Sequence, residues 1–131
     1  MIEQRIAQIT LVVNDYDEAI QFYTQKLNFV LTEDTKLSET KRWVRIKPSG
    51  SSEFCLLLAK ADGEEQKSRV GNQTGGRVFL FLYTDDLSRD YIHMKDNKIE
   101  FIREPIKEKW GMVAVFKDLY GNLWDLIQPD N

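Results

Sequence analysis

The sequence predicts an α+β protein made of two tandem βαβββ modules. The order of strand, helix and three strands in the first half is repeated in the second, and placing Asp15 on Asp86 aligns the apolar positions of the two helices. A polar, Gly-containing stretch at 60–76 separates the halves. Each half is too small to bury both faces of its own sheet, so we expect one domain, 1–131, built from modules at about 1–60 and 77–131.

Hydrophobic periodicity predicts the elements of the first module. Residues 6–13 (IAQITLVV) alternate as a strand does. Asp15 is a suitable N-cap with acids in the following turn, and an apolar stripe at helical spacing continues to Leu27, where Asn28 ends the helix. Three more strands are predicted, at 29–31, 42–47 and 53–59.

The second module repeats this order. Residues 78–84 (VFLFLYT) predict a strand, and Asp85-Asp86 cap a helix that Lys98 ends. We expect Glu104-Pro105 to break the next strand, because proline cannot donate to a sheet ladder. The strands of this half are predicted at 99–101, 112–117 and 123–128.

Composition excludes several classes of function. Hydrophobic residues make up 42% and charged residues 30% of the 131 residues, as in an ordinary globular protein, and the net charge of −3 argues against a nucleic-acid or anionic-membrane surface. No apolar run is long enough to span a bilayer, and the N-terminus has no signal-peptide core, so we expect a cytoplasmic protein. The single cysteine, Cys55, lies in an apolar run, which favours a buried thiol over a nucleophile.

Several segments resemble the vicinal oxygen chelate (VOC) superfamily, also called the glyoxalase/bleomycin resistance/dioxygenase superfamily. They include ITLVVNDYDEAIQFYTQKLNFVL (9–31), WGMVAVFKDLYGN (110–122) and LWDLIQ (123–128). The chain departs from the family at Leu119, usually proline, and at Asn28, usually glycine. The resemblance implies that each module curls its mixed sheet around a cleft. It also implies that enzymes of the family hold a divalent metal through residues of the first and last strands, which here fall on Gln8, near Leu57, on Phe79 and on Asp125.

Those four positions make a poor metal site, because only Gln8 and Asp125 carry a donor atom. We therefore expect no metal cofactor. The alternative is a divergent metal-dependent lyase, isomerase or dioxygenase that uses Gln8 and Asp125. The only histidine, His93, lies on the second predicted helix and is expected to be structural.

An aromatic-lined cleft is predicted instead. Such a cleft suits a planar or amphipathic small molecule. Two other interpretations stay open: the aromatic residues fill a core, and Asp125 pairs with Arg45 or Arg77 at the cleft edge. The predicted ligand-binding residues are Gln8, Thr10, Trp43, Arg45, Phe79, Phe81, Tyr83, Trp110 and Asp125.

The predicted function is the binding of a small organic molecule, a drug or metabolite, as in bleomycin-resistance proteins. The sequence leaves open whether the chain is an enzyme, although the poor ligand set argues against it. A second alternative is a protein-binding scaffold without catalysis. A homodimer is expected, because small members of the family often dimerise and residues 78–84 carry no charged or proline gatekeeper.

Overall fold

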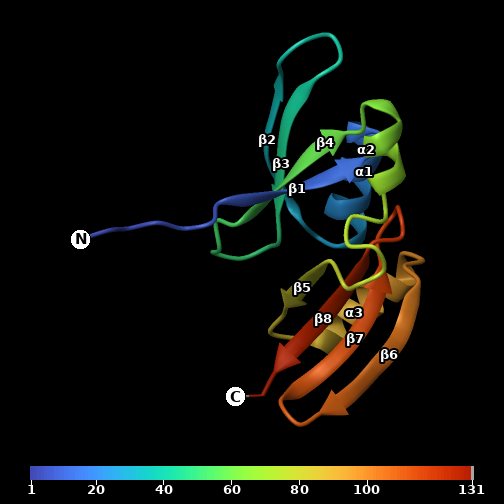
Figure 1. Ribbon diagram of the computed structural model, residues 1–131. Coiled ribbons are helices and arrows are strands. Elements are labelled where there is room, and N and C mark those ends of the chain that lie inside the picture. Colours follow the sequence, from blue (N-terminus) through green and yellow to red (C-terminus); the bar gives the residue numbers. More distant parts are fainter. Residues whose placement is uncertain (131) are drawn as a thin grey trace. The chain divides into compact units, whose positions relative to one another are not determined.

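The computed structural model consists of two four-stranded mixed sheets, each with its own helices (Figure 1). It describes residues 1–130. Contacts divide the chain into two compact units, Met1–Val70 (unit 1) and Gly71–Asn131 (unit 2). The predicted α+β class and the repeated βαβββ order are confirmed. That the two units form one domain stays a prediction.

Unit 1 contains the five expected elements and one further helix, α2; the predicted first helix is divided into α1 and the π-helical segment η1. Its strand order is β1-β4-β3-β2, with β1 parallel to β4 and the other pairs antiparallel. The elements are β1 (Gln8–Val13), α1 (Tyr16–Gln21), the π-helical segment η1 (Phe22–Lys26), β2 (Val30–Lys36), β3 (Arg42–Lys47), β4 (Cys55–Lys60) and α2 (Gly63–Arg69).

Unit 2 repeats this topology. Its strand order is β5-β8-β7-β6, again with one parallel pair, β5 and β8. Its elements are β5 (Leu80–Tyr83), α3 (Leu87–Asp96), β6 (Phe101–Glu108), β7 (Gly111–Lys117) and β8 (Leu123–Pro129).

The helix boundaries follow the predicted signals. Asp15 and Asp86 are both N-caps, and each carboxylate accepts a backbone N–H three residues further on. Asn28 and Lys98, which follow the helices of the two units, have positive φ angles of 59° and 67°. Asparagine tolerates this left-handed conformation, whereas lysine adopts it at a cost.

The core of each unit lies between its sheet and its helices. In unit 1 the most deeply buried ring is Tyr23, which meets Phe22 and Phe29 with ring centroids 5.4 and 5.3 Å away. In unit 2 Phe116 and Trp124 stack with centroids 5.8 Å apart. Tyr23, Phe22 and Met94 are buried, whereas Tyr91 is only half-buried. Cys55 is a free, buried thiol, as its apolar run predicts.

Two predictions about elements were wrong. The polar stretch 60–76 contains α2, which buries no residue and therefore shows no apolar periodicity. The Glu104-Pro105 pair does not end β6, which continues to Glu108. Because β6 is an edge strand and its register shifts between Arg103 and Ile106, the proline lies in a bulge where no ladder bond is needed.

Across residues 1–130, none of the helices combines the length and the apolar character that crossing a membrane requires.

Candidate functional site

In unit 1, one side of the sheet is turned away from α1 and carries four of the predicted site residues. Leu11, Val44 and Leu58 are buried on the helix side. Strand alternation therefore places Gln8 and Thr10 on the opposite side. The strand register agrees. On β1 and β4, Gln8 lies opposite Cys55 and Thr10 lies opposite Leu57. On β3, Arg45 lies opposite Leu57, so Arg45 and Trp43 are on this side too.

Arg45 is half-buried on this side and has a local partner. Its Nη1 lies 3.7 Å from Oε1 of Glu33, the residue opposite it on β2. Its Nε is buried and has no hydrogen-bond partner within residues 1–130. Within unit 1, the carboxylate near Arg45 is that of Glu33. The pairing of Asp125 with Arg45 stays an open interpretation.

A groove of about 680 Å³ opens in unit 1, and we name it the hairpin groove. The β2–β3 hairpin forms one wall, because β3 pairs with β4 only from Val44 to Ile46 and the hairpin tip extends beyond β4 (Figure 1). The end of β4 and α2 form the other wall. The lining residues are Tyr16, Leu37, Thr40, Lys41, Arg42, Trp43, Leu57, Leu58, Ala59, Lys60, Ala61, Asp62 and Gln66.

In unit 2, the side of the sheet turned away from α3 carries exposed aromatic rings; we call it the aromatic face. Trp124 and Leu126 are buried on the α3 side, so Asp125 lies on the other. Phe81 stands opposite Asp125 and is 61% exposed. Tyr83, one step along the same strand, is 67% exposed. For Phe81 and Tyr83, the interpretation that the aromatic residues fill a core is therefore wrong.

Phe79 and Trp110 lie apart from this pair. Phe79 precedes β5, where its N–H donates to the carbonyl of Leu123, and its ring is half-buried. Trp110 is exposed in the β6–β7 turn. The turn adjoins Gly111 at the start of β7, whereas the residue paired with Asp125 is Val115, four positions further along that strand. Four strand residues span about 13 Å. Trp110 is thus not brought together with Asp125.

The turn before β8 holds Asp125 in place. Asp118 is buried, and its Oδ1 accepts the N–H groups of Tyr120 and Asn122 at 3.0 and 2.9 Å. Its Oδ2 accepts the Asn122 side-chain amide at 2.8 Å. The Asp118 carboxylate thus closes a turn in which Leu119 stands at the position where the family usually has proline. The closed turn fixes the register in which β8 starts.

Asp125 itself is half-buried between Phe81 and Val115. Burial raises the pKa of Asp125, and the positive charge of Arg103 partly opposes this shift. Arg103 stands opposite Val115 on β6, one strand further out. The carboxylate is therefore on a partly apolar surface, where a hydrogen-bond donor from a ligand would offset its lost hydration.

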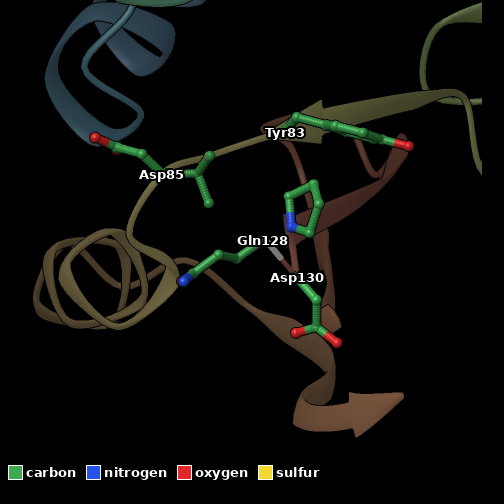
Figure 2. A pocket seen from close by; sticks show the side chains of 6 residues that line it. Tyr83, Asp85, Gln128 and Asp130 are labelled. Carbon is green, nitrogen blue, oxygen red and sulfur yellow. The ribbon is translucent and has the colours of Figure 1, made fainter. Parts of the chain in front are cut away.

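A cavity of about 360 Å³ in unit 2 lies beside Tyr83, but its polar side chains do not point toward a common centre. Figure 2 shows that the Tyr83 and Asp85 side chains extend in opposite directions. Gln128 points toward α3, where its Oε1 accepts the N–H of Leu87 at 2.8 Å. Because these polar groups diverge or are already bonded, the cavity offers no constellation for chemistry.

The residues do not fit the metal site of the family's enzymes. Of the four corresponding positions, Leu57 and Phe79 have no donor atom and only Gln8 and Asp125 have one. Among residues 1–130, no three His, Cys, Asp or Glu side chains lie close enough together to hold a metal ion. His93 is half-buried on α3, with its ring next to Asn97.

Sequence reasoning missed three cations near these surfaces. Lys41 and Lys60 line the hairpin groove, and Arg103 acts on Asp125. The signal for Lys41 and Lys60 was weak, because one lies in a hairpin turn and the other at a strand end. Arg103 was hidden by the expected strand break after it.

Comparisons with known proteins agree with this fold. A sequence model of the Glyoxalase/Bleomycin resistance protein/Dioxygenase superfamily matches residues 5–126. An uncharacterized protein of Shewanella frigidimarina is 58% identical over 127 residues, covering 96% of this chain and 94% of its own.

Two solved structures are similar throughout. UcmS2 superposes with a TM-score of 0.84 at 28% identity, covering 96% of this chain and 98% of its own. TnmS3, an antibiotic binding protein from Streptomyces sp. CB03234, superposes with a TM-score of 0.78 at 25% identity, covering 99% of both chains. The chain belongs to the Glyoxalase/Bleomycin resistance protein/Dioxygenase superfamily.

Proposed function

We propose that this protein binds a small organic molecule, with the aromatic face of unit 2 as a contact surface and Asp125 as a polar anchor. The observation that carries the proposal is the pairing of two largely exposed rings, Phe81 and Tyr83, with a half-buried carboxylate on one sheet face. Exposed aromatic rings on a rigid strand offer stacking area at little entropic cost, and a half-buried acid supplies orientation. The similarity to TnmS3, an antibiotic binding protein, supports a ligand of drug-like size.

Binding in this proposal needs no metal. The donor set supports this, since Gln8 and Asp125 are the only two donors at the four family positions. Metal analysis of protein purified without chelators tests it. Less than one metal ion per ten chains is expected. A stoichiometric divalent ion that is lost in Asp125→Asn would instead support the metal-dependent enzyme.

The binding surface is tested with phenylnaphthylamine, a neutral planar dye that becomes fluorescent in apolar sites. Saturable binding is expected, and Phe81→Ser should weaken it. The exposed part of the Phe81 ring is about 120 Å² if the whole side chain is taken as about 200 Å², which corresponds to at most about 3 kcal/mol. Ile92→Ser removes an equally exposed apolar side chain from α3 and serves as the control. Equal dye affinity in Phe81→Ser and wild type would refute the proposed surface.

Self-association is part of the same proposal. The short strand β5 is an edge strand of its sheet, and a second copy of the chain would cover this edge in a homodimer while the aromatic face stays open to ligand. Light scattering at micromolar concentration should give the dimer mass. A monomer mass would refute the homodimer.

A further inference from the structure

We propose that the hairpin groove of unit 1 is a subsite for a planar aromatic ligand that carries an acidic group, and that Lys41 and Lys60 select for the acid. This inference rests on the proposed small-molecule binding and names the chemistry of the molecule. The groove volume of about 680 Å³ is in the range of small-molecule sites, which is about 300–1,000 Å³.

The walls of the groove suit an aromatic ring. Trp43 lies on β3, half-buried, and lines the groove together with Leu57 and Ala59 of the neighbouring strand. Leu37, exposed at the hairpin tip, adds an apolar side chain to the opposite end. An indole beside aliphatic side chains favours offset stacking with a planar ligand, which adds to the area that the ligand buries.

Two lysines that line the groove are available to an acidic group. Within residues 1–130, no carboxylate lies within 4 Å of the ammonium group of Lys41 or Lys60 in the ion pairs of the structure, and Asp62 is the one acidic side chain of the lining. Arg42 also lines the groove, but its charge is offset by Asp34 and Asp17. Both lysines also line a neighbouring cavity with Asp15, Asp34 and Glu39, so an anion would be held by direct contact with the two ammonium groups and not by a net positive charge of the groove.

The two lysines approach the groove from different elements. Lys41 is in the hairpin turn, where its carbonyl accepts the N–H groups of Leu37 and Ser38 at 2.9 and 3.1 Å. Lys60 ends β4, which pairs with β1. Both lysines line the same groove, and their backbones are held in a turn and in a strand.

A matched pair of dyes tests the inference. Anilinonaphthalene sulfonate and phenylnaphthylamine share their ring system, and only the first carries an acid. Wild type should bind the sulfonate more tightly. Lys41→Gln and Lys60→Gln should each weaken sulfonate binding about fivefold, because one pair of unit charges at contact in water is worth about 1 kcal/mol. Each should change phenylnaphthylamine binding less than about twofold, because that dye carries no charge. Trp43→Leu should also weaken sulfonate binding, because it removes the ring from the groove wall.

Lys109→Gln is the control, since it removes the same charge from an exposed position outside the groove. The inference is overturned if Lys109→Gln has the effect of Lys41→Gln, or if both dyes lose affinity equally in the groove lysine variants. If Phe81→Ser weakens sulfonate binding and the groove lysine variants do not, the inference fails and the proposed function stands. If neither dye binds saturably, both fail.

Discussion

Arg42 joins three elements of unit 1, and replacing it should destabilise the β2–β3 hairpin. Its Nε and Nη2 bond both carboxylate oxygens of Asp34 on β2, at 3.1 and 2.6 Å. Its Nη1 lies 2.9 Å from Asp17 of α1, and its guanidinium lies over the Tyr16 ring, 5.1 Å from the centroid. The hydrogen bond to Asp34 is the main cause that raises the pKa of Arg42, against an opposing effect of burial; Asp17 adds to the increase.

The expected loss for Arg42→Met is about 2–3 kcal/mol in the free energy of unfolding. The forked pair with Asp34 should contribute about 1.5–3 kcal/mol, because both side chains are about two-thirds or more shielded and the bonds are charged. Asp17 is 79% exposed, so its pair adds at most about 0.5–1 kcal/mol. Methionine keeps the apolar stem of the side chain, which limits the change to the lost charge and hydrogen bonds.

Urea unfolding followed by circular dichroism measures this loss. Arg42→Lys keeps the charge but not the planar fork, so it should recover less than half of the stability. Arg69→Met is the control: it removes an exposed pair with Glu65, 3.3 Å away, and should cost less than about 0.5 kcal/mol. The reasoning is refuted if Arg42→Met costs no more than Arg69→Met, or if lysine replaces arginine without loss.

Three further predictions follow from single residues. Lys98→Gly should stabilise the protein by up to about 1 kcal/mol by relieving the left-handed backbone, whereas Lys98→Ala should not; thermal unfolding separates them. Burial raises the pKa of Asp125 in the folded protein above its unfolded value, so the folded protein favours the protonated acid. This contribution to stability is complete below the unfolded pKa and is lost as pH rises through the folded pKa. The stability of Asp125→Asn relative to wild type should therefore increase from about pH 4 to about pH 7. Gly111→Ala should destabilise far more than Gly121→Ala, because a Cβ at Gly111 meets the Gln128 carbonyl at 2.3 Å while Gly121 faces open space; equal losses in urea unfolding would contradict this.

Strong local signals allowed much of the fold to be predicted from sequence. The caps at Asp15 and Asp86, the alternation in 42–47 and the turn that ends at Asn122 all correspond to observed elements. Each signal rests on local chemistry: a side chain that bonds its own backbone, or strand positions that alternate between core and surface. Helix α2 lacks such a signal, because its stability comes from charged ends and not from a buried stripe.

The candidate site was predicted less completely, because strand alternation gives the side of a sheet but not the position along it. Gln8, Thr10, Trp43 and Arg45 share a side as expected, and so do Phe81 and Asp125. Trp110 does not join them, because the length of β7 places it at the far end of the strand. The local partners of Arg45 and Asp125 depend on cross-strand register, which the sequence does not specify.

The two units show how the same topology can be given different chemistry. Counting from the N-caps, Thr10 of unit 1 corresponds to Phe81 of unit 2, and both occupy the parallel strand pair. Their partners are Leu57 and Asp125. At these equivalent positions, one unit therefore has a polar residue beside an apolar one, and the other has an aromatic ring beside an acid. If the aromatic face binds the proposed ligand, Asp125→Asn should alter binding without altering the fold, because Asp125 lies on that face and not among the buried residues of unit 2.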